Sequence, residues 1–242
     1  MNLAPEVGSV AEMISLLIAT RNAHKVGEIR AILGDGFRYF TLEDFPAAPE
    51  TVEDVATFAG NAQKKAVELA RWVAGAQCSV FSVQAEPSFV LADDSGLEVD
   101  ALGGAPGVHS ARFAALDTGK SGNSATADNN AKLLRLLATV PTEARTARFR
   151  CVIALTPVTP GKVQVSSPVC YADEPELQTQ LFEGACEGRI LSAPRGQGGF
   201  GYDPLFVPEG FDQTFAELGE DVKNRRSHRA RALAKLKAAL KS

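Results

Sequence analysis

Short apolar runs alternate with helical repeats along the first third of the chain. Residues 14–19 (ISLLIA) form an uninterrupted apolar run that predicts a buried strand, and residues 38–41 predict a second strand. Between them, apolar residues recur at helical spacing until Gly34 and Gly36 end the helix. A longer helix is predicted from Thr57, because four apolar residues trace one of its faces: Phe58, Ala62, Leu69 and Val73.

The rest of the chain continues this alternation. Residues 90–92 predict a strand that enters a turn at residues 93–96, and residues 129–137 predict a helix. Residues 224–240 predict one basic amphipathic helix whose inward side chains are Ala230, Leu233, Leu236 and Leu240. Further strands are predicted at residues 148–155, 163–165, 169–171 and 205–207, with Gly-rich loops at 103–107 and 193–202. Interleaved strands and helices favour a layered α/β fold.

Composition narrows the class of partner. The 242-residue chain has a formal net charge of −4, whereas proteins that bind duplex nucleic acid usually show a basic surplus. A small phosphorylated ligand needs only a few local cations, so the acidity does not argue against one. No apolar run is long enough to cross a membrane. The cysteines contain no Cys-x-x-Cys pair and indicate reduced thiols in a cytoplasmic protein: Cys78, Cys151, Cys170 and Cys186.

The domain organisation is simple. Residues 1–13 lack the basic start and apolar stretch of a signal peptide and predict a flexible tail. We find no fixed-period repeat and no Gly/Ser linker in the remainder, so residues 14–242 are expected to form one domain.

A first candidate motif lies where the first strand meets the first helix, at residues 20–25 (TRNAHK). Backbone N–H groups at a helix start bind anions, and Lys25 adds a mobile positive charge that suits a triphosphate. The alternative is an ordinary capped helix with a solvated lysine. The segment is not a Walker motif, because it lacks Gly-Lys-Ser/Thr.

A second motif places two adjacent carboxylates, Asp93 and Asp94, after an apolar strand. Adjacent strand residues face opposite ways, so one carboxylate should point into a site and the other should hold the loop. Mg²⁺ takes one or two carboxylates together with phosphate oxygens and water, and Glu50 in an acidic loop is the expected second acid. The alternative is an Asx turn that ends the strand.

A third motif is the Gly-rich stretch 196–204 (GQGGFGYDP). Phe200 and Tyr202 offer ring faces on which a base can stack, and Asp203 can accept a hydrogen bond from a base N–H. The alternative is a flexible hairpin whose aromatic rings belong to the core.

A fourth motif is the basic stretch 223–229 (KNRRSHR), which offers donors for phosphate and for a base carbonyl, or else forms a solvated basic face. Zinc chemistry fits poorly, because His24, His109 and His228 have no metal-ligand spacing. Serine hydrolysis fits poorly as well, since Ser95 lies in no Gly-x-Ser-x-Gly elbow.

Together and in this order, these segments resemble the inosine triphosphate pyrophosphatase family, which acts on noncanonical purine nucleoside triphosphates. The matching stretches are ATRNAHKVGEIRAIL from Ala19, TFAGNAQKKA from Thr57, LADDSGLEVDALGGAPGVHSARFA from Leu91, GGFGYDPLFVPEG from Gly198 and KNRRSHRARAL from Lys223. The resemblance implies an elongated mixed β-sheet flanked by helices, with two lobes and a central active-site cleft. It also implies hydrolysis of ITP, dITP and XTP to the monophosphate and pyrophosphate, a homodimer, and Mg²⁺ as cofactor.

The resemblance assigns roles residue by residue. Asp94 is the expected proton acceptor and, with Glu50, a metal ligand, while Lys25 neutralises the leaving pyrophosphate. His228 and Arg229 are expected to donate to the carbonyl at purine position 6, which adenosine lacks. The expected substrate contacts are Thr20, Arg21, Asn22, Ala23, His24, Lys25, Ser95, Phe200, Gly201, Tyr202, Asp203, Lys223, His228 and Arg229.

The sequence also departs from the family pattern. Arg21 stands where a small residue is frequent, and segments near residues 72–89 and 166–182 are longer than expected and indicate surface insertions. Two other functions stay open. One is a nucleotide pyrophosphatase of the Maf-like kind that acts on dTTP or UTP, and the other is a nucleotide-binding protein without catalysis.

Overall fold

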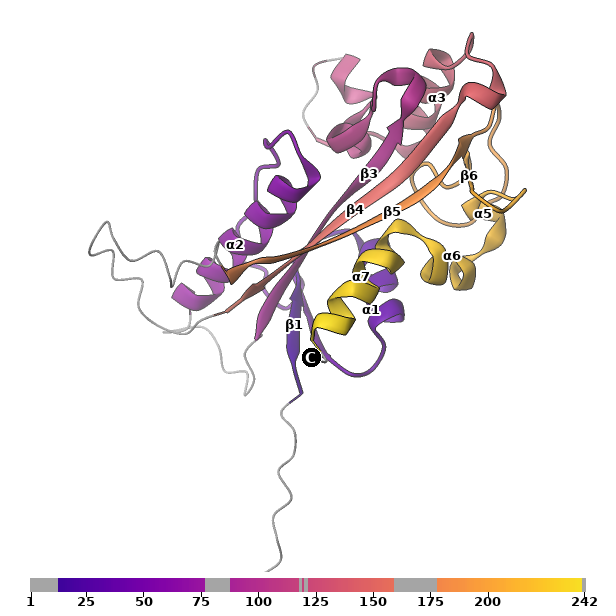
Figure 1. Ribbon diagram of the computed structural model, residues 1–242. Helices are drawn as coiled ribbons and strands as arrows, with labels where there is room; N and C mark the ends of the chain where they lie inside the picture. The colour runs from indigo at the N-terminus through magenta and orange to yellow at the C-terminus, as the bar shows by residue number, and fades with distance from the viewer. Residues whose placement is uncertain (1–12, 77–87, 118, 120–121, 159–177, 241–242) are drawn as a thin grey trace, which may run out of the picture.

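A six-stranded mixed sheet organises the chain, of which this computed structural model describes residues 13–76, 88–117, 119, 122–158 and 178–240 (Figure 1). The strand order is β2-β1-β3-β4-β5-β6. The strands are β1 (Ser15–Ile18), β2 (Arg38–Thr41), β3 (Phe89–Val99), β4 (Thr146–Pro157), β5 (Gln180–Ile190) and β6 (Phe206–Pro208).

The sheet has a short parallel part and a long antiparallel part. β1 is parallel to both β2 and β3, whereas β4, β5 and β6 each run antiparallel to the strand before. β1 ends at Ile18, which lies opposite Leu91, while β3 continues to Val99 and stays paired with β4 throughout. Asp93 and Asp94 therefore lie just beyond the end of β1.

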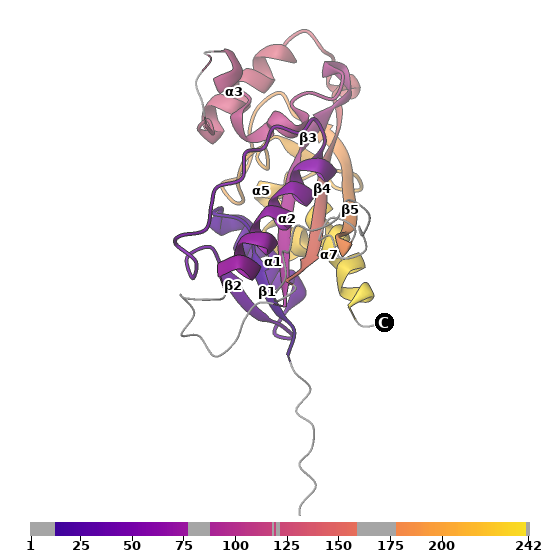
Figure 2. The ribbon, with the colours of Figure 1, turned by 90° about the vertical axis from the view of Figure 1, so that its left-hand side faces the viewer.

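Helices cover both faces of the sheet (Figures 1 and 2). α2 (Phe58–Ala76) packs on one face, and α1 (Ala23–Leu33) and α7 (His228–Ala239) pack on the other. The remaining helices are α3 (Thr126–Leu136), α5 (Phe215–Leu218) and α6 (Glu220–Arg226), with 3-10 turns η1 (Asp100–Leu102), η2 (Gly107–Arg112), η3 (Ala115–Asp117) and η4 (Thr142–Ala144).

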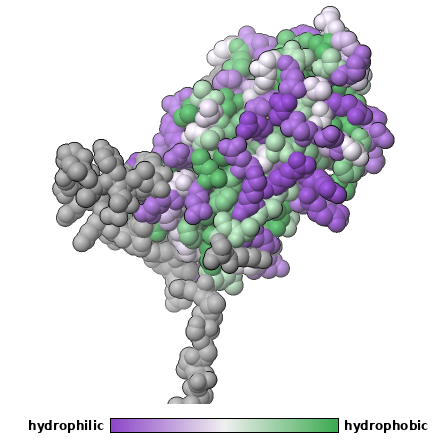
Figure 3. All heavy atoms as spheres, viewed as in Figure 1, coloured by the Kyte–Doolittle hydropathy of each residue, from purple (hydrophilic) through white to green (hydrophobic). Residues whose placement is uncertain are grey.

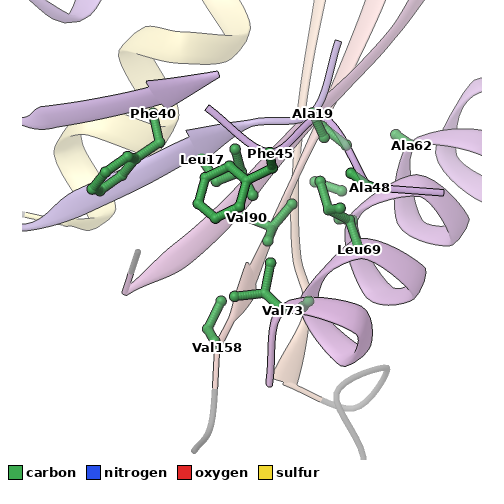
Figure 4. Packing of buried hydrophobic residues seen from close by; sticks show 14 of the residues in the cluster. Leu17, Ala19, Phe40, Phe45, Ala48, Ala62, Leu69, Val73, Val90 and Val158 are labelled. Atoms are coloured by element: carbon green, nitrogen blue, oxygen red, sulfur yellow. The ribbon is translucent and has the colours of Figure 1, made fainter. Parts of the chain in front are cut away.

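Alternation along the central strands gives each face its own apolar cluster. On the α2 face, Leu17 and Val90 meet Leu69 and Val73 of the helix (Figure 4). On the opposite face, the neighbouring strand residues Leu16 and Leu91 contact α1 and α7, and a third cluster joins the far end of β3 and β4 to α3, β6 and α5. The long strands thus connect two lobes, as Figure 1 shows.

Several predicted elements are confirmed. β1, β2 and the helix that Gly34 ends lie where the apolar pattern places them, and so do α2, α3, β4 and β6 within a few residues. The predicted strands at residues 163–165 and 169–171 lie outside the described residues, as do residues 77–87 of the first expected insertion. Trp72–Ala76 continue α2, and residues 180–182 begin β5.

Two predictions are wrong. The expected turn at residues 93–96 is the middle of β3, because β4 pairs with this stretch along its whole length. The single helix expected over residues 224–240 is two helices, α6 and α7, separated at Ser227. Ser227 has an extended backbone, with φ −66° and ψ 165°, and its hydroxyl accepts from the Ala230 N–H as the N-cap of α7.

Part of the basic stretch 223–229 is exposed to solvent, as one of the two interpretations of that motif predicts. Figure 3 shows hydrophilic side chains gathered over α6 and its neighbours, where Arg225, Arg226, Arg231 and Lys235 are exposed. Among the described residues, no helix combines the length and the apolar character that a membrane crossing requires.

Gly184 lets α7 approach β5 closely, which gives a stability prediction. A Cβ at Gly184 would overlap the carbonyl oxygen of His228 and lie 2.6 Å from the Ala232 nitrogen. Since these are backbone atoms, Gly184→Ala should lower the free energy of unfolding by about 1–3 kcal/mol or more. Urea unfolding monitored by circular dichroism measures this.

The matched control is Gly27→Ala on α1, where a Cβ meets nothing within 4 Å. Alanine there should stabilise the helix by up to about 1 kcal/mol. Equal free energies of unfolding for the two variants would show that α7 can move away from a Cβ at residue 184 without loss of stability, which would contradict the prediction.

Candidate active site

Three distant segments meet beyond the end of β1: the start of α1, the middle of β3, and the α6–α7 junction. The Asn22 side chain caps α1 by accepting from the N–H groups of His24 (3.0 Å) and Lys25 (3.3 Å). The Thr20 hydroxyl in turn accepts from the Asn22 N–H at 3.2 Å. The cap therefore already uses two of the helix-start donors that the sequence assigns to a phosphate, and the Lys25 ammonium is the main cation of this segment.

Asp93 is the centre of a buried ion cluster on the α1 and α7 side of β3. Its carboxylate receives a salt bridge from Lys25 and hydrogen bonds from the Arg229 guanidinium, Nε to Oδ2 at 2.9 Å and Nη2 to Oδ1 at 3.3 Å. Ser95, two residues along the same strand face, donates to Asp93 at 3.0 Å and accepts from Arg229 at 2.9 Å. Burial alone raises the pKa of Asp93, but Arg229 and Lys25 hold that pKa well below its usual value.

Glu28 extends this cluster toward the C-terminal segment, and sequence reasoning missed it. Its carboxylate pairs with Arg229 and lies 2.7 Å from Lys223 Nζ. The Lys223 ammonium also binds Asp203 at 2.6 Å. Glu28 stands three residues after Lys25 on α1, and this helical spacing is the signal that could have placed both on one side.

Arg229 is buried and held by charged partners. Its side chain is 1% exposed and is held by Asp93, Glu28 and Ser95. The carboxylates raise the pKa of Arg229 despite the opposing effect of burial. The guanidinium is thus engaged by three side chains in the free protein, and its expected contact with a base carbonyl stays a prediction.

The Gly-rich motif contributes Phe200 to an exposed ring contact. The imidazole of His24 stacks on Phe200 with ring centroids 5.2 Å apart and planes 15° from parallel. Lys223 Nζ lies 4.3 Å from the centroid of the same ring, and the Phe200 N–H donates to Asp203 at 2.8 Å. The motif is thereby fixed to both α1 and α6.

The other members of this motif have structural contacts. Tyr202 is buried in the core, and its hydroxyl donates to the Ser110 carbonyl at 2.9 Å, which favours the alternative that this aromatic ring belongs to the core. The Gly201 carbonyl accepts from the Asn130 amide of α3 at 3.2 Å. The buried carboxyl of Asp203 has a raised pKa because burial outweighs the lowering effect of Lys223.

His228 opens α7 as a buried, neutral ring. It stacks on Phe149 with centroids 4.9 Å apart, and burial lowers its pKa well below the usual value, helped by the charges of Arg229 and Lys223. Within the described part of the chain, His228 Nδ1 is buried and has no hydrogen-bond partner. A buried polar atom left without a partner marks a place for a ligand or a water molecule.

Asp94 faces the opposite side of β3, as adjacent strand residues must. Its Oδ2 accepts from the Asn61 amide at 3.2 Å, and its Oδ1 accepts from Lys65 Nζ at 3.3 Å. Burial raises the pKa of Asp94, while the charges of Lys65 and Lys25 lower it. Lys65 donates both to the Asp94 carboxylate and to the Asp93 carbonyl, so it contacts two adjacent residues of β3 whose side chains face opposite sides.

The second acid beside Asp94 is Glu53, where counting along the loop predicts Glu50. Lys65 Nζ lies 3.2 Å from Glu53, and it also donates to the Asp93 carbonyl oxygen at 2.7 Å. Glu50 is exposed, and over the ranges described here it forms no hydrogen bond or ion pair. The Glu53 backbone carbonyl accepts a hydrogen bond from Arg112 at 3.1 Å, which holds this part of the loop in place.

These oxygens fit a divalent cation by their chemistry. The carboxylates of Asp94 and Glu53 and the carbonyl of Asp93 all contact one ammonium, so they already converge on a positive charge. Mg²⁺ prefers such oxygen ligands and takes its remaining ligands from water and substrate phosphates. Among the described residues, no group of three or more His, Cys, Asp or Glu side chains is placed to hold a metal ion.

Comparisons with known proteins match almost the whole chain. The Ham1 family matches residues 16–239. The dITP/XTP pyrophosphatase of Geobacter sulfurreducens is 47% identical over 227 residues, which are 93% of this chain and 96% of that protein. The dITP/XTP pyrophosphatase of Shouchella clausii is 43% identical over 225 residues, again 93% and 96%.

Solved structures show the same fold. A HAM1 protein from Coxiella burnetii superposes with a TM-score of 0.71 at 32% identity and covers 95% of this chain and 99% of that one. The nucleoside-triphosphatase, or dITP/XTP pyrophosphatase, of Mycobacterium abscessus gives a TM-score of 0.64 at 36% identity, covering 92% and 98%. The elongated mixed sheet flanked by helices is therefore confirmed as the fold.

Proposed function

Because the chain belongs to the Ham1 family, we propose that it hydrolyses noncanonical purine nucleoside triphosphates, namely ITP, dITP and XTP, to the monophosphate and pyrophosphate. The enzyme is a nucleoside-triphosphate pyrophosphohydrolase that acts on an acid anhydride. The observation that carries the proposal is the meeting of cations from both ends of the chain around Asp93 and Glu28, with Asp94 as the next residue along β3. A triphosphate needs such a concentration of positive charge beside an acid that can accept a proton.

Side chains on both sides of β3 have roles in the proposed reaction. Asp94 would orient a water molecule and accept its proton as the water oxygen bonds to the α-phosphorus. The bond between the α-phosphorus and the bridging oxygen then breaks, and pyrophosphate leaves with the electron pair. Lys25 and Lys65 would neutralise the negative charge on the leaving phosphates, which is the main demand of phosphoryl chemistry.

We propose Mg²⁺ as the cofactor, held by Asp94 and Glu53. When bound, it would supply positive charge to the phosphate oxygens and lower the pKa of a coordinated water. The convergence of both carboxylates on the Lys65 ammonium supports this pair of ligands and replaces the expected pair of Asp94 and Glu50.

The ligand assignment predicts opposite results for two neighbouring glutamates. Glu53→Gln should raise the half-saturating Mg²⁺ concentration for ITP hydrolysis by at least about 10-fold, because a coordinating charge is lost. Glu50→Gln changes an exposed carboxylate in the same loop and should leave that concentration within a factor of two or so. Thermal melts with and without Mg²⁺ and a nucleotide provide a readout that does not depend on turnover. If Glu50→Gln has the larger effect, Glu50 is the ligand after all.

Selectivity for a 6-oxo purine is proposed to involve His228. Its neutral ring and unpartnered Nδ1 support a hydrogen bond to the base, with an Nδ1–H donating to the carbonyl of hypoxanthine or xanthine. Adenine would leave that buried donor unmatched at a cost of about 1–3 kcal/mol, which is roughly one to two decades of discrimination.

We further propose that the enzyme works as a cytoplasmic homodimer that removes damaged nucleotides from the pool. The resemblance to the family supports this assembly, and sedimentation at micromolar concentration tests it. A monomer that turns over ITP at full rate would separate assembly from activity.

Pyrophosphate release from ITP, dITP, XTP, ATP, GTP and dTTP, each with and without Mg²⁺, tests the function. The first three should be preferred and should require Mg²⁺. Preference for dTTP would favour the Maf-like alternative. Tight binding of ITP without pyrophosphate release would favour a nucleotide-binding protein without catalysis.

A further inference from the structure

The contact between His24 and Phe200 covers a ring on which, according to the sequence, a base is expected to stack. The centroids are 5.2 Å apart and the planes nearly parallel, which is an ordinary stacked pair. A purine held between the two rings would need stacking contacts of about 3.5 Å on each side, so the rings would have to stand roughly 7 Å apart. The observed separation leaves no space for a base.

His24 is attached so that only its side chain needs to move. Its backbone N–H is fixed by the Asn22 cap, whereas its imidazole is exposed. Within the described ranges, the imidazole takes part in no hydrogen bond or ion pair, and its stacking on Phe200 is the contact observed. A rotation about the side-chain bonds would uncover Phe200 while leaving the first turn of α1 intact.

Phe200 cannot uncover itself in the same way. The Lys223 Nζ lies 4.3 Å from the centroid of the Phe200 ring. Lys223 is itself held by Asp203 at 2.6 Å and by Glu28 at 2.7 Å, so the ring packs against a fixed neighbour. The fixed member of the stack is therefore Phe200 and the movable member is His24.

We propose that His24 is an internal competitor of the base: its imidazole occupies the stacking face of Phe200 in the free enzyme, and the purine must displace it. This inference rests on the proposed function and deepens it, since it concerns the same nucleotide site. It replaces the expectation that the His24 side chain binds the substrate. The displacement weakens the binding of every purine by the same factor, because the imidazole must leave Phe200 whichever group the purine carries at position 6.

The test is a pair of substitutions at this position, with two readouts. His24→Ala removes the competing ring and should lower both the KM for ITP and the dissociation constant of ITP measured without Mg²⁺ by about 2- to 10-fold. His24→Phe supplies a ring that stacks better and should raise both constants. The ratio of kcat/KM for ITP to that for ATP should be the same in all three proteins, and the inhibition constant of pyrophosphate, which has no base, should not change.

Each contrary result is informative. A higher KM and dissociation constant in His24→Ala would show that the imidazole holds the base, and unchanged constants in both variants would show that it does not compete; either overturns the inference. If the wild-type protein binds ITP without releasing pyrophosphate, the proposed function fails, while the dissociation constants of the variants still decide the role of His24.

Discussion

Asp94→Asn should lower pyrophosphate release from ITP by about 10²- to 10⁴-fold, which is the usual contribution of a positioned general base. The substitution keeps the volume of the side chain and one oxygen for Lys65, but it removes the negative charge and the proton acceptor. Folding should survive, because Asp94 lies in the middle of a strand whose backbone pairing with β4 does not depend on its side chain. Initial rates at saturating Mg²⁺ and ITP measure the effect.

Asp54→Asn is the matched control for Asp94→Asn. Asp54 makes an exposed salt bridge to Lys64, one residue before the lysine that contacts Asp94. Such surface pairs contribute little, so this variant should keep nearly the whole rate. A rate for Asp94→Asn close to that of Asp54→Asn would remove Asp94 from the chemistry.

The dependence of the hydrolysis rate on pH is also expected to follow from Asp94. Only the ionised carboxylate of Asp94 can accept a proton, and burial raises its pKa above the ordinary value of 3.8. Activity is therefore full above this pKa and falls as the pH drops through it, and because Mg²⁺ bound to the carboxylate opposes protonation, the acid limb should lie at higher pH when Mg²⁺ is low. The slight rate left in Asp94→Asn should lack this limb.

Arg229→Met should be the most destabilising of the substitutions considered, at about 3–5 kcal/mol. The guanidinium is buried, and its loss removes one of the two cations on the buried carboxylate of Asp93 and one of the two cations on Glu28. Methionine fills much of the volume, so the cost arises from the uncompensated charge rather than from a cavity. Urea unfolding at neutral pH measures it.

The pH dependence of this loss has a defined sign. In the folded wild type the pKa of Asp93 lies well below its usual value, so its ion pairs stabilise the protein above that usual value. This stabilisation is lost as the pH falls through the lowered pKa. The difference between wild type and Arg229→Met should therefore shrink in acid.

Arg231→Met on the same helix is the control for Arg229→Met. Arg231 is exposed and donates to the Ala185 carbonyl at 2.8 Å, so its loss should cost no more than about 0.5 kcal/mol. Equal losses for the two variants would contradict the assignment of Arg229 as the cation that holds Asp93.

The sequence predicts the strands and helices whose buried faces carry apolar side chains, and it misses a strand whose buried face carries glycine. β5 is the clearest case. Two of its inward positions are Gly184 and Gly188, where a Cβ would meet the α7 backbone or Val207 and Phe206. Because glycine replaces the branched apolar residues that usually mark a buried strand, the segment gives no apolar alternation to read.

The site is predictable as far as strand geometry determines it. Adjacent strand residues must face opposite sides, and Asp93 and Asp94 do so. The sequence cannot distinguish Glu50 from Glu53, because an irregular loop has no periodicity. It also cannot separate the buried Arg229 from the exposed Arg225 and Arg226, since that depends on the break at Ser227 and on Glu28, far away in the chain.

The uninterrupted pairing of β3 has a consequence for dynamics. Catalytic groups are often carried by segments that open easily, whereas Asp93 and Asp94 sit within a strand hydrogen-bonded to β4 from Phe89 to Val99. The amide protons of this strand should be among the slowest in the protein to exchange with solvent deuterium. Nucleotide binding should then protect amides around the start of α1 and the Gly-rich motif, while the strand that carries the acids stays as rigid as before.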